Sequence, residues 1–167
     1  MRSVVIGLAL AFGALSAFAQ QPAAGNPAQA MKAFASSADA AALVAKAKSD
    51  RKEGQAVLVQ PLLRLAPYTV NLEYRVAVAT ASVHEREAEL FYVVDGSGTI
   101  VTGGKLVKEN RTNAENLTGT AIEGGSSQHV AKGDFVLVPE GTPHWFSAID
   151  GNLVLMSLHL PRAPRSN

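Results

Sequence analysis

The clearest pattern in the chain is an alternation of apolar and polar residues between Val70 and Val78. The even positions are apolar or aromatic, and most odd positions between them are polar. Successive side chains of a strand point to opposite faces, so this period of two predicts a strand whose even positions face the interior. The same parity, unless a bulge breaks it, carries Thr80, Ser82 and His84 to the interior as well.

Further short apolar segments follow at close intervals, separated mostly by turns rich in Gly, Pro and Asp. They cover residues 90–94, 98–102, 128–131, 135–138, 145–149 and 153–160. Many short strands at this spacing predict an all-β sandwich or barrel instead of βαβ units. The polar stretch from Lys105 to Gly125 is longer than a hairpin loop, which is typical of a functional or mobile segment.

One helix is expected before the strands. The segment from Ser37 to Lys52 begins with Ser and Asp as capping candidates, has Ala and Leu in its middle and basic residues late, and is followed by Gly54. Leu43 and Val44 give it only a narrow apolar stripe. We therefore expect residues 37–54 to pack on the outside of a sheet, with a partner-binding helix as the alternative.

The first 19 residues have the layout of a secretory signal peptide. A positive charge precedes an apolar run from Val4 to Leu15, and Ala17 and Ala19 form an A-x-A cleavage site. The run is shorter than the ~20 apolar residues that span a bilayer, which disfavours a membrane anchor. We expect a flexible tether at 20–36 and a mature protein secreted into an exported compartment, most simply a bacterial periplasm.

Composition and charge narrow the class of protein. The chain has 167 residues, 47% of them hydrophobic, which suits one domain; residues 55–162 are expected to form it, with a tail at 163–167. Fifteen basic against fourteen acidic residues, without a dense basic block, argue against nucleic acid as a partner. Because cysteine is absent, there is no disulfide and no lipidated Cys, so no membrane attachment is expected after cleavage.

Two motifs carry the candidate chemistry. In the first, between 82 and 98, His84 and Glu89 precede an apolar strand, and Gly96 follows Glu89 by seven residues. The second, between 133 and 146, is a Gly, five residues and then P-x-G-x-x-H, with fixed positions Gly133, Pro139, Gly141 and His144. Together they resemble the paired motifs of the cupin superfamily, in particular its small single-domain, type-2 members.

The resemblance implies both a fold and a metal site. It implies a double-stranded β-helix, the jelly-roll barrel, with the one N-terminal α-helix beside it. It also implies that His84, Glu89 and His144 bind one divalent transition metal. The family usually opens its first motif with H-x-H, and the first His falls here on Ser82. Two imidazoles and a carboxylate suit Fe, Zn, Mn or Ni and leave positions open for water or substrate.

Arg86 and Tyr74 are further candidates for ligand binding, whereas His129 and His159 match no motif position. Arg86 could bind a substrate carboxylate beside the metal, or it could be a solvated rim arginine. Tyr74 shares the inward parity and could offer its hydroxyl to a ligand, or it could simply pack. His129 is expected to be exposed, and His159 to point away from the apolar even-numbered face of the last strand.

Two functional classes follow. One is a metal-dependent oxygenase, isomerase or lyase acting on a small organic molecule, its catalytic residues unknown; the other is a non-catalytic module that binds a small ligand or a metal. Both faces of the last strand are apolar, Leu153 and Leu155 against Val154 and Met156. A homodimer is expected to cover one face unless the helix does so.

Overall fold

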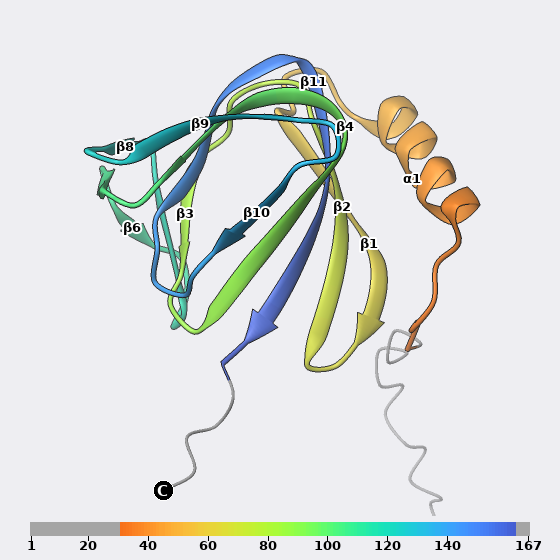
Figure 1. Ribbon diagram of the computed structural model, residues 1–167, viewed down its shortest axis with the longest axis horizontal. Coiled ribbons are helices and arrows are strands. Elements are labelled where there is room, and N and C mark those ends of the chain that lie inside the picture. The colour runs from red at the N-terminus through yellow and green to blue at the C-terminus, as the bar shows by residue number, and fades with distance from the viewer. Residues whose placement is uncertain (1–30, 163–167) are drawn as a thin grey trace, which may run out of the picture.

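The structure is a computed structural model that describes residues 31–162 (Figure 1). The predicted signal peptide at 1–19, most of the predicted tether at 20–36 and the tail at 163–167 lie outside the described residues. Export therefore stays a prediction. No helix in the described part of the chain is long and apolar enough to cross a membrane.

The helix α1 spans Ser37–Asp50, inside the predicted range of 37–54. Its start is fixed by a reciprocal cap: the Asp39 amide donates to the Ser36 hydroxyl at 3.1 Å, and the Ser36 amide donates to the Asp39 carboxylate at 2.8 Å. α1 lies outside the barrel against β1 and β2, and Ala47 is its buried residue. The narrow apolar stripe thus gives a helix that covers a sheet and adds little core.

The strands that follow alternate with short turns, as the sequence predicts. In chain order they are β1 Val57–Leu65, β2 Tyr68–Arg75, β3 Ala81–His84, β4 Glu87–Thr102, β5 Lys105–Val107, β6 Asn110–Arg111, β7 Asn116–Gly119, β8 Ala121–Glu123, β9 Ser126–Ala131, β10 Phe135–Val138 and β11 His144–Pro161. The prediction of an all-β jelly-roll barrel with one N-terminal helix is confirmed.

The two long strands β4 and β11 connect the layers of the barrel. The first half of β4 and the second half of β11 pair antiparallel within the order β1-β2-β11-β4-β10. Their other halves pair within the opposite layer, which β9, β3, β7 and β6 complete. The two motifs, which are distant in sequence, therefore meet inside one barrel.

Gly96 marks the place where β4 passes from one layer to the other. Its φ is 79°, and a Cβ there would lie 2.0 Å from the backbone oxygen of Asn152. A side chain is excluded both by the left-handed backbone and by the close approach of β11. The bend in β4 therefore requires glycine at position 96.

The hydrophobic core lies between the two layers and adjoins the interior pocket. Phe91 and Phe146 belong to both, and their rings meet edge to face with centroids 5.3 Å apart. The other buried members of the core are Val93, Ile100, Val130, Val138, Leu153 and Leu155. These core residues lie on β4, β9, β10 and β11, and their close packing holds the pocket walls in place.

The predicted parity of β2 is wrong. Its odd-numbered residues line the interior pocket; these are Asn71, Glu73 and Arg75. Leu72 on the other face is fully buried, and α1 packs against β1 and β2 from outside. The alternation identified two faces correctly, but an apolar face can also be covered from outside. Ser82 does line the pocket as predicted. Residues 76–80 are not strand, so the inward-facing positions change from odd numbers in β2 to even numbers in β3.

Candidate metal site

A pocket of about 200 Å³ lies inside the barrel. One wall is polar and consists of Asn71, Glu73, Arg75, Thr80 and Ser82. The aromatic part of the lining consists of Phe91, Trp145 and Phe146. The volume is below the roughly 300–1,000 Å³ of pockets that hold drug-sized ligands, so the space suits a small molecule.

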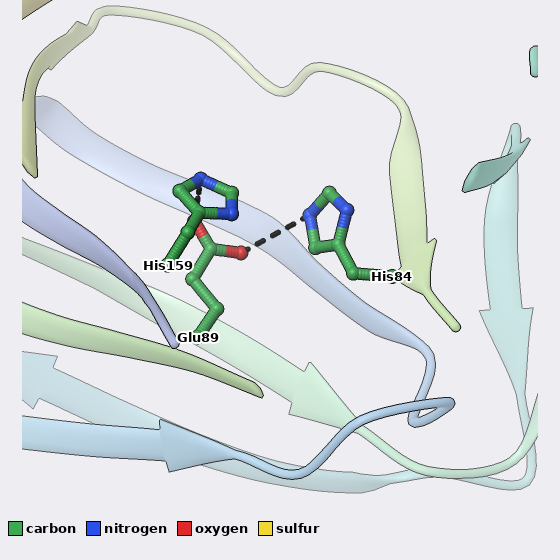
Figure 2. A group of neighbouring side chains, drawn as sticks. All are labelled: His84, Glu89 and His159. Atoms are coloured by element: carbon green, nitrogen blue, oxygen red, sulfur yellow. Dashed lines mark ion pairs between the residues drawn. The ribbon is translucent and has the colours of Figure 1, made fainter. Parts of the chain in front are cut away.

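At one end of the pocket, three imidazoles surround the carboxylate of Glu89. Its Oε2 lies 3.3 Å from His84 Nε2 and 3.2 Å from His144 Nε2. Its Oε1 lies 3.4 Å from His159 Nε2. Glu89 and His144 are buried, and His84 and His159 are mostly buried. Figure 2 shows Glu89 between His84 and His159, with both ion pairs drawn.

The register of the strands brings these four residues together. His84 is the last residue of β3, and His144 is the first of β11, where it pairs with Ser82 of β3. Near the other end of β11, His159 lies directly opposite Glu89 of β4. The Gly141 amide of the second motif donates to the His84 carbonyl at 2.7 Å, which ties the two motifs together.

The other ring nitrogen of each imidazole, Nδ1, has an oxygen acceptor within hydrogen-bond distance. His84 Nδ1 lies 2.6 Å from Asn116 Oδ1, and His159 Nδ1 lies 2.7 Å from Glu87 Oε1. His144 Nδ1 lies 3.2 Å from the carbonyl oxygen of Thr142. An acceptor at Nδ1 favours the tautomer with the proton there, which leaves the Nε2 lone pair free. All three Nε2 atoms are on the side of Glu89.

These separations suit a bound metal ion. Two donors at about 2.1 Å from one ion, 90° to 109° apart, lie about 3.0–3.4 Å from each other. His144 and His84 lie 3.2 and 3.3 Å from Glu89 Oε2, and His159 lies 3.4 Å from the other oxygen, Oε1. The donor atoms of His84, Glu89 and His159 lie within 4.8 Å of one another. Neutral imidazole with carboxylate is a donor set for transition metals, so the residues present fit such an ion.

The charges in the site are coupled. Burial alone would raise the pKa of the Glu89 carboxyl, but hydrogen bonds with His144 and His84 outweigh it and hold that pKa well below its usual range. Burial would lower the pKa of His84, but the bonds with Glu89 and Asn116 raise it above its ordinary value. Glu89 is therefore ionised throughout the physiological range, as a metal ligand must be.

The structure thus brings together His84, Glu89 and His144 and adds His159. His159 does point away from the even-numbered face of β11, but the expectation that this even face is the interior one is wrong: the odd face of β11 is the inner one, so His159 lines the pocket. The available signal was the odd-numbered series Leu153, Leu155, Ser157 and His159, whose first two members lie in the core. His129 is exposed as expected and pairs with Asp150.

Neither Arg86 nor Tyr74 lines the pocket, which fits the alternatives stated for them, a solvated rim arginine and a packing tyrosine. Arg86 is 73% exposed, lies 3.5 Å from Glu115 and does not line the pocket. Tyr74 is absent from the pocket lining too, because it lies on the outer face of β2. The arginine in the pocket is Arg75, whose Nε donates to Glu73 Oε2 at 2.9 Å and whose guanidinium lies 4.7 Å from the Phe146 ring centroid.

The chain belongs to the cupin family, whose sequence model matches residues 57–162. The match covers both motifs and all eleven strands described above, from β1 to β11. A search of the curated proteins found no significant match.

Solved structures with a similar fold have low sequence identity. KdgF from Halomonas sp. is 16% identical, with a TM-score of 0.49, over 68% of this chain and 86% of that one. A cupin superfamily protein from Desulfitobacterium hafniense DCB-2 is 14% identical, with a TM-score of 0.47, over 67% and 83%. HppE with Fe(II) is 16% identical, with a TM-score of 0.50, over 66% and 54%. At these identities the likeness concerns the fold alone.

Proposed function

We propose that this cupin binds one divalent transition metal through His84, Glu89, His144 and His159, and admits a small organic ligand beside it. The observation that carries the proposal is the convergence of three Nε2 atoms on one ionised carboxylate, with every Nδ1 engaged by an acceptor. In this arrangement His159 supplies the imidazole that the family motif would have at position 82. Fe, Zn, Mn and Ni all suit these donors.

The pocket beside the donors supports a small polar ligand. The Glu73 carboxylate and Arg75 guanidinium pair with each other at 2.6 Å, so the wall that they form has no net charge. Asn71, Thr80 and Ser82 offer amide and hydroxyl groups for hydrogen bonds. Trp145 and Phe146 provide an apolar wall, so we expect a ligand with one polar and one apolar side.

The reaction class that we propose is metal-dependent oxygenase, isomerase or lyase chemistry on such a molecule. A bound metal would act as a Lewis acid or as an oxygen site. The chain's own residues would hold the metal, orient the ligand along the polar wall and limit water through the buried aromatic wall. With the predicted leader, we propose that the protein works in an exported compartment.

A non-catalytic binding module is the second candidate, and one observation favours it. The carboxylates nearest the donors are already engaged: Glu73 pairs with Arg75, and Glu87 contacts His159. Neither is free to act as a general base. Turnover of a compound that binds the metal-loaded protein would decide for the enzyme, and tight binding without turnover would decide for the module.

Elemental analysis of the purified protein tests the metal site. We expect about one transition metal per chain in the wild type. His144→Ala and His159→Ala each remove a donor and should weaken metal binding by more than the roughly 10- to 100-fold that loss of an outer partner costs. His129→Ala is the matched control, because His129 is exposed and pairs with Asp150 away from the pocket.

Two results would contradict the proposal in different ways. A folded wild type that contains no metal and resists loading with Fe(II), Zn(II), Mn(II) and Ni(II) would overturn the metal site altogether. Loss of metal in His144→Ala but not in His159→Ala would reduce the site to His84, Glu89 and His144, the set that the motifs imply.

A further inference from the structure

The polar stretch after β4 contains a hairpin that packs beside a donor residue. β6 and β7 form this hairpin, and β7 pairs with β3 so that Asn116 lies directly opposite His84. The Glu85 amide donates to the Glu115 carbonyl at 2.8 Å, and Arg111 donates to both carboxylate oxygens of Glu85 at 2.8 and 3.0 Å. The hairpin is thereby fastened to the segment that carries His84.

A chain of three hydrogen bonds in the hairpin determines which way the Asn116 amide faces. The Glu115 backbone amide, which can only donate, lies 2.9 Å from the Asn113 side chain, so the atom there must be the oxygen Oδ1. The same oxygen lies 3.1 Å from Asn116, which must therefore donate through its Nδ2. The oxygen of Asn116 is left to face His84 Nδ1 at 2.6 Å.

An acceptor at that place decides between the two neutral forms of His84. The Glu89 carboxylate, 3.3 Å from His84 Nε2, would otherwise draw the proton to Nε2 and occupy the lone pair that a metal needs. Glu87 is a poor substitute for Asn116, since its Oε1 is 3.9 Å from His84 Nδ1 and already contacts His159 at 2.7 Å. Asn116 therefore competes with Glu89 for the His84 proton.

We propose that Asn116, oriented by Asn113, is a positioning residue that keeps the proton of His84 on Nδ1 and directs its Nε2 lone pair toward the metal. The proposal rests on the proposed metal function and assigns a role to the 105–125 stretch. Outer partners of this kind set the tautomer and the orientation of a ligating histidine. The Glu115 backbone amide, acting through Asn113 and Asn116, thereby determines that Nε2 of His84 is the nitrogen without a proton.

The first test reads the tautomer directly in the metal-free protein. Nitrogen NMR of the imidazoles at alkaline pH, where His84 is neutral, should show the proton on Nδ1 in the wild type. Asn116→Leu should move it to Nε2, and Asn116→Asp, which keeps an acceptor, should leave it on Nδ1. Asn110→Leu is the matched control, because the exposed Asn110 lies on the neighbouring strand of the same hairpin.

The second test measures metal affinity by competition with a chelator, using Zn(II) as the probe. Asn116→Leu should bind about 10- to 100-fold more weakly than the wild type, whereas Asn116→Asp and Asn110→Leu should bind as the wild type does. If Asn116→Leu does not fold, Asn113→Ala replaces it: the amide loses its orienting acceptor, and a mixture of the two tautomers is expected.

The outcomes separate this inference from the proposed function. A proton on Nε2 of His84 in the wild type, or an unchanged tautomer in Asn116→Leu, would overturn the positioning role. If the tautomers behave as expected but the wild type binds no metal, the metal function fails while the role of Asn116 in orienting His84 stands.

Discussion

Glu89 is the residue around which the candidate site is arranged, and its charge state sets how the site responds to pH. The folded protein holds the pKa of Glu89 below the ordinary 4.5, so this group stabilises the fold above pH 4.5 and ceases to do so as the pH falls through its lowered pKa. The pKa of His84 is raised above the ordinary 6.5. Its stabilising effect is complete below pH 6.5 and is lost as the pH rises through the raised pKa.

The metal-free protein should therefore be most stable to heat between about pH 4.5 and 6.5, with a decline on the alkaline side as His84 loses its proton. Adding Zn(II) should reverse the alkaline trend, since the metal binds neutral imidazole. Thermal melts across this range with and without Zn(II) measure both effects. Glu89→Gln is the isosteric control and should flatten the metal-free profile. Metal-free stability that rises steadily from pH 5 to 9 would contradict the coupling.

Among the elements, α1 is the one whose contribution to stability is least evident from burial. It places only Ala47 out of contact with solvent, yet it begins with a complete reciprocal cap between Ser36 and Asp39. Because α1 packs on β1 and β2, melting of its first turn should loosen the outer side of the strand that carries the polar pocket wall. The cap should therefore matter for the whole domain.

Ser36→Ala should lower the free energy of unfolding by about 1 kcal/mol, since it removes the side-chain acceptor for the Asp39 amide. Ser37→Ala is the matched control, because Ser37 is the first residue inside the helix and the cap is formed without its side chain. Urea unfolding of the two variants and the wild type provides the comparison. Equal midpoints for all three would mean that α1 unfolds independently of the barrel.

For the molecule as a whole, the question is which apolar surface would associate, and β10 is an edge strand that carries two of the exposed large apolar side chains of the described residues. Leu153, Val154 and Leu155 of β11 are fully buried within one chain, so the cover that they require is already present. Phe135 and Leu137 of β10 remain 68% and 60% exposed. β10 pairs with β4 on one side, and no second strand pairing of β10 is formed within the described residues. An apolar edge strand of this kind favours association.

The homodimer stays a prediction, and its expected interface moves from β11 to β10. Light scattering at micromolar concentration should give twice the chain mass, and the double variant Phe135→Glu, Leu137→Glu should give a monomer that still binds metal. Val78→Glu is the control, since Val78 is an exposed apolar residue outside β10. A monomeric wild type would show that the edge strand is tolerated without a partner.

The sequence by itself determined the fold class, the helix and the motif residues of the site. Three local properties of the sequence correspond to features of the structure. Alternation with a period of two corresponds to strands, the glycines Gly96 and Gly133 to bends with positive φ, and His144 to the start of a strand. The helix was predictable for the same reason, because a cap and a propensity act within a few residues of the chain.

Only the tertiary structure decided which face of each strand is the interior. The pattern of β2 shows two faces, but the polar one points inward because α1 covers the apolar one from outside. His159 enters the site because β11 aligns it with Glu89, and Asn116 reaches His84 because β7 pairs with β3. Such pairings join residues that are 70 and 32 positions apart, respectively, and strand register between distant segments depends on packing that no local pattern contains.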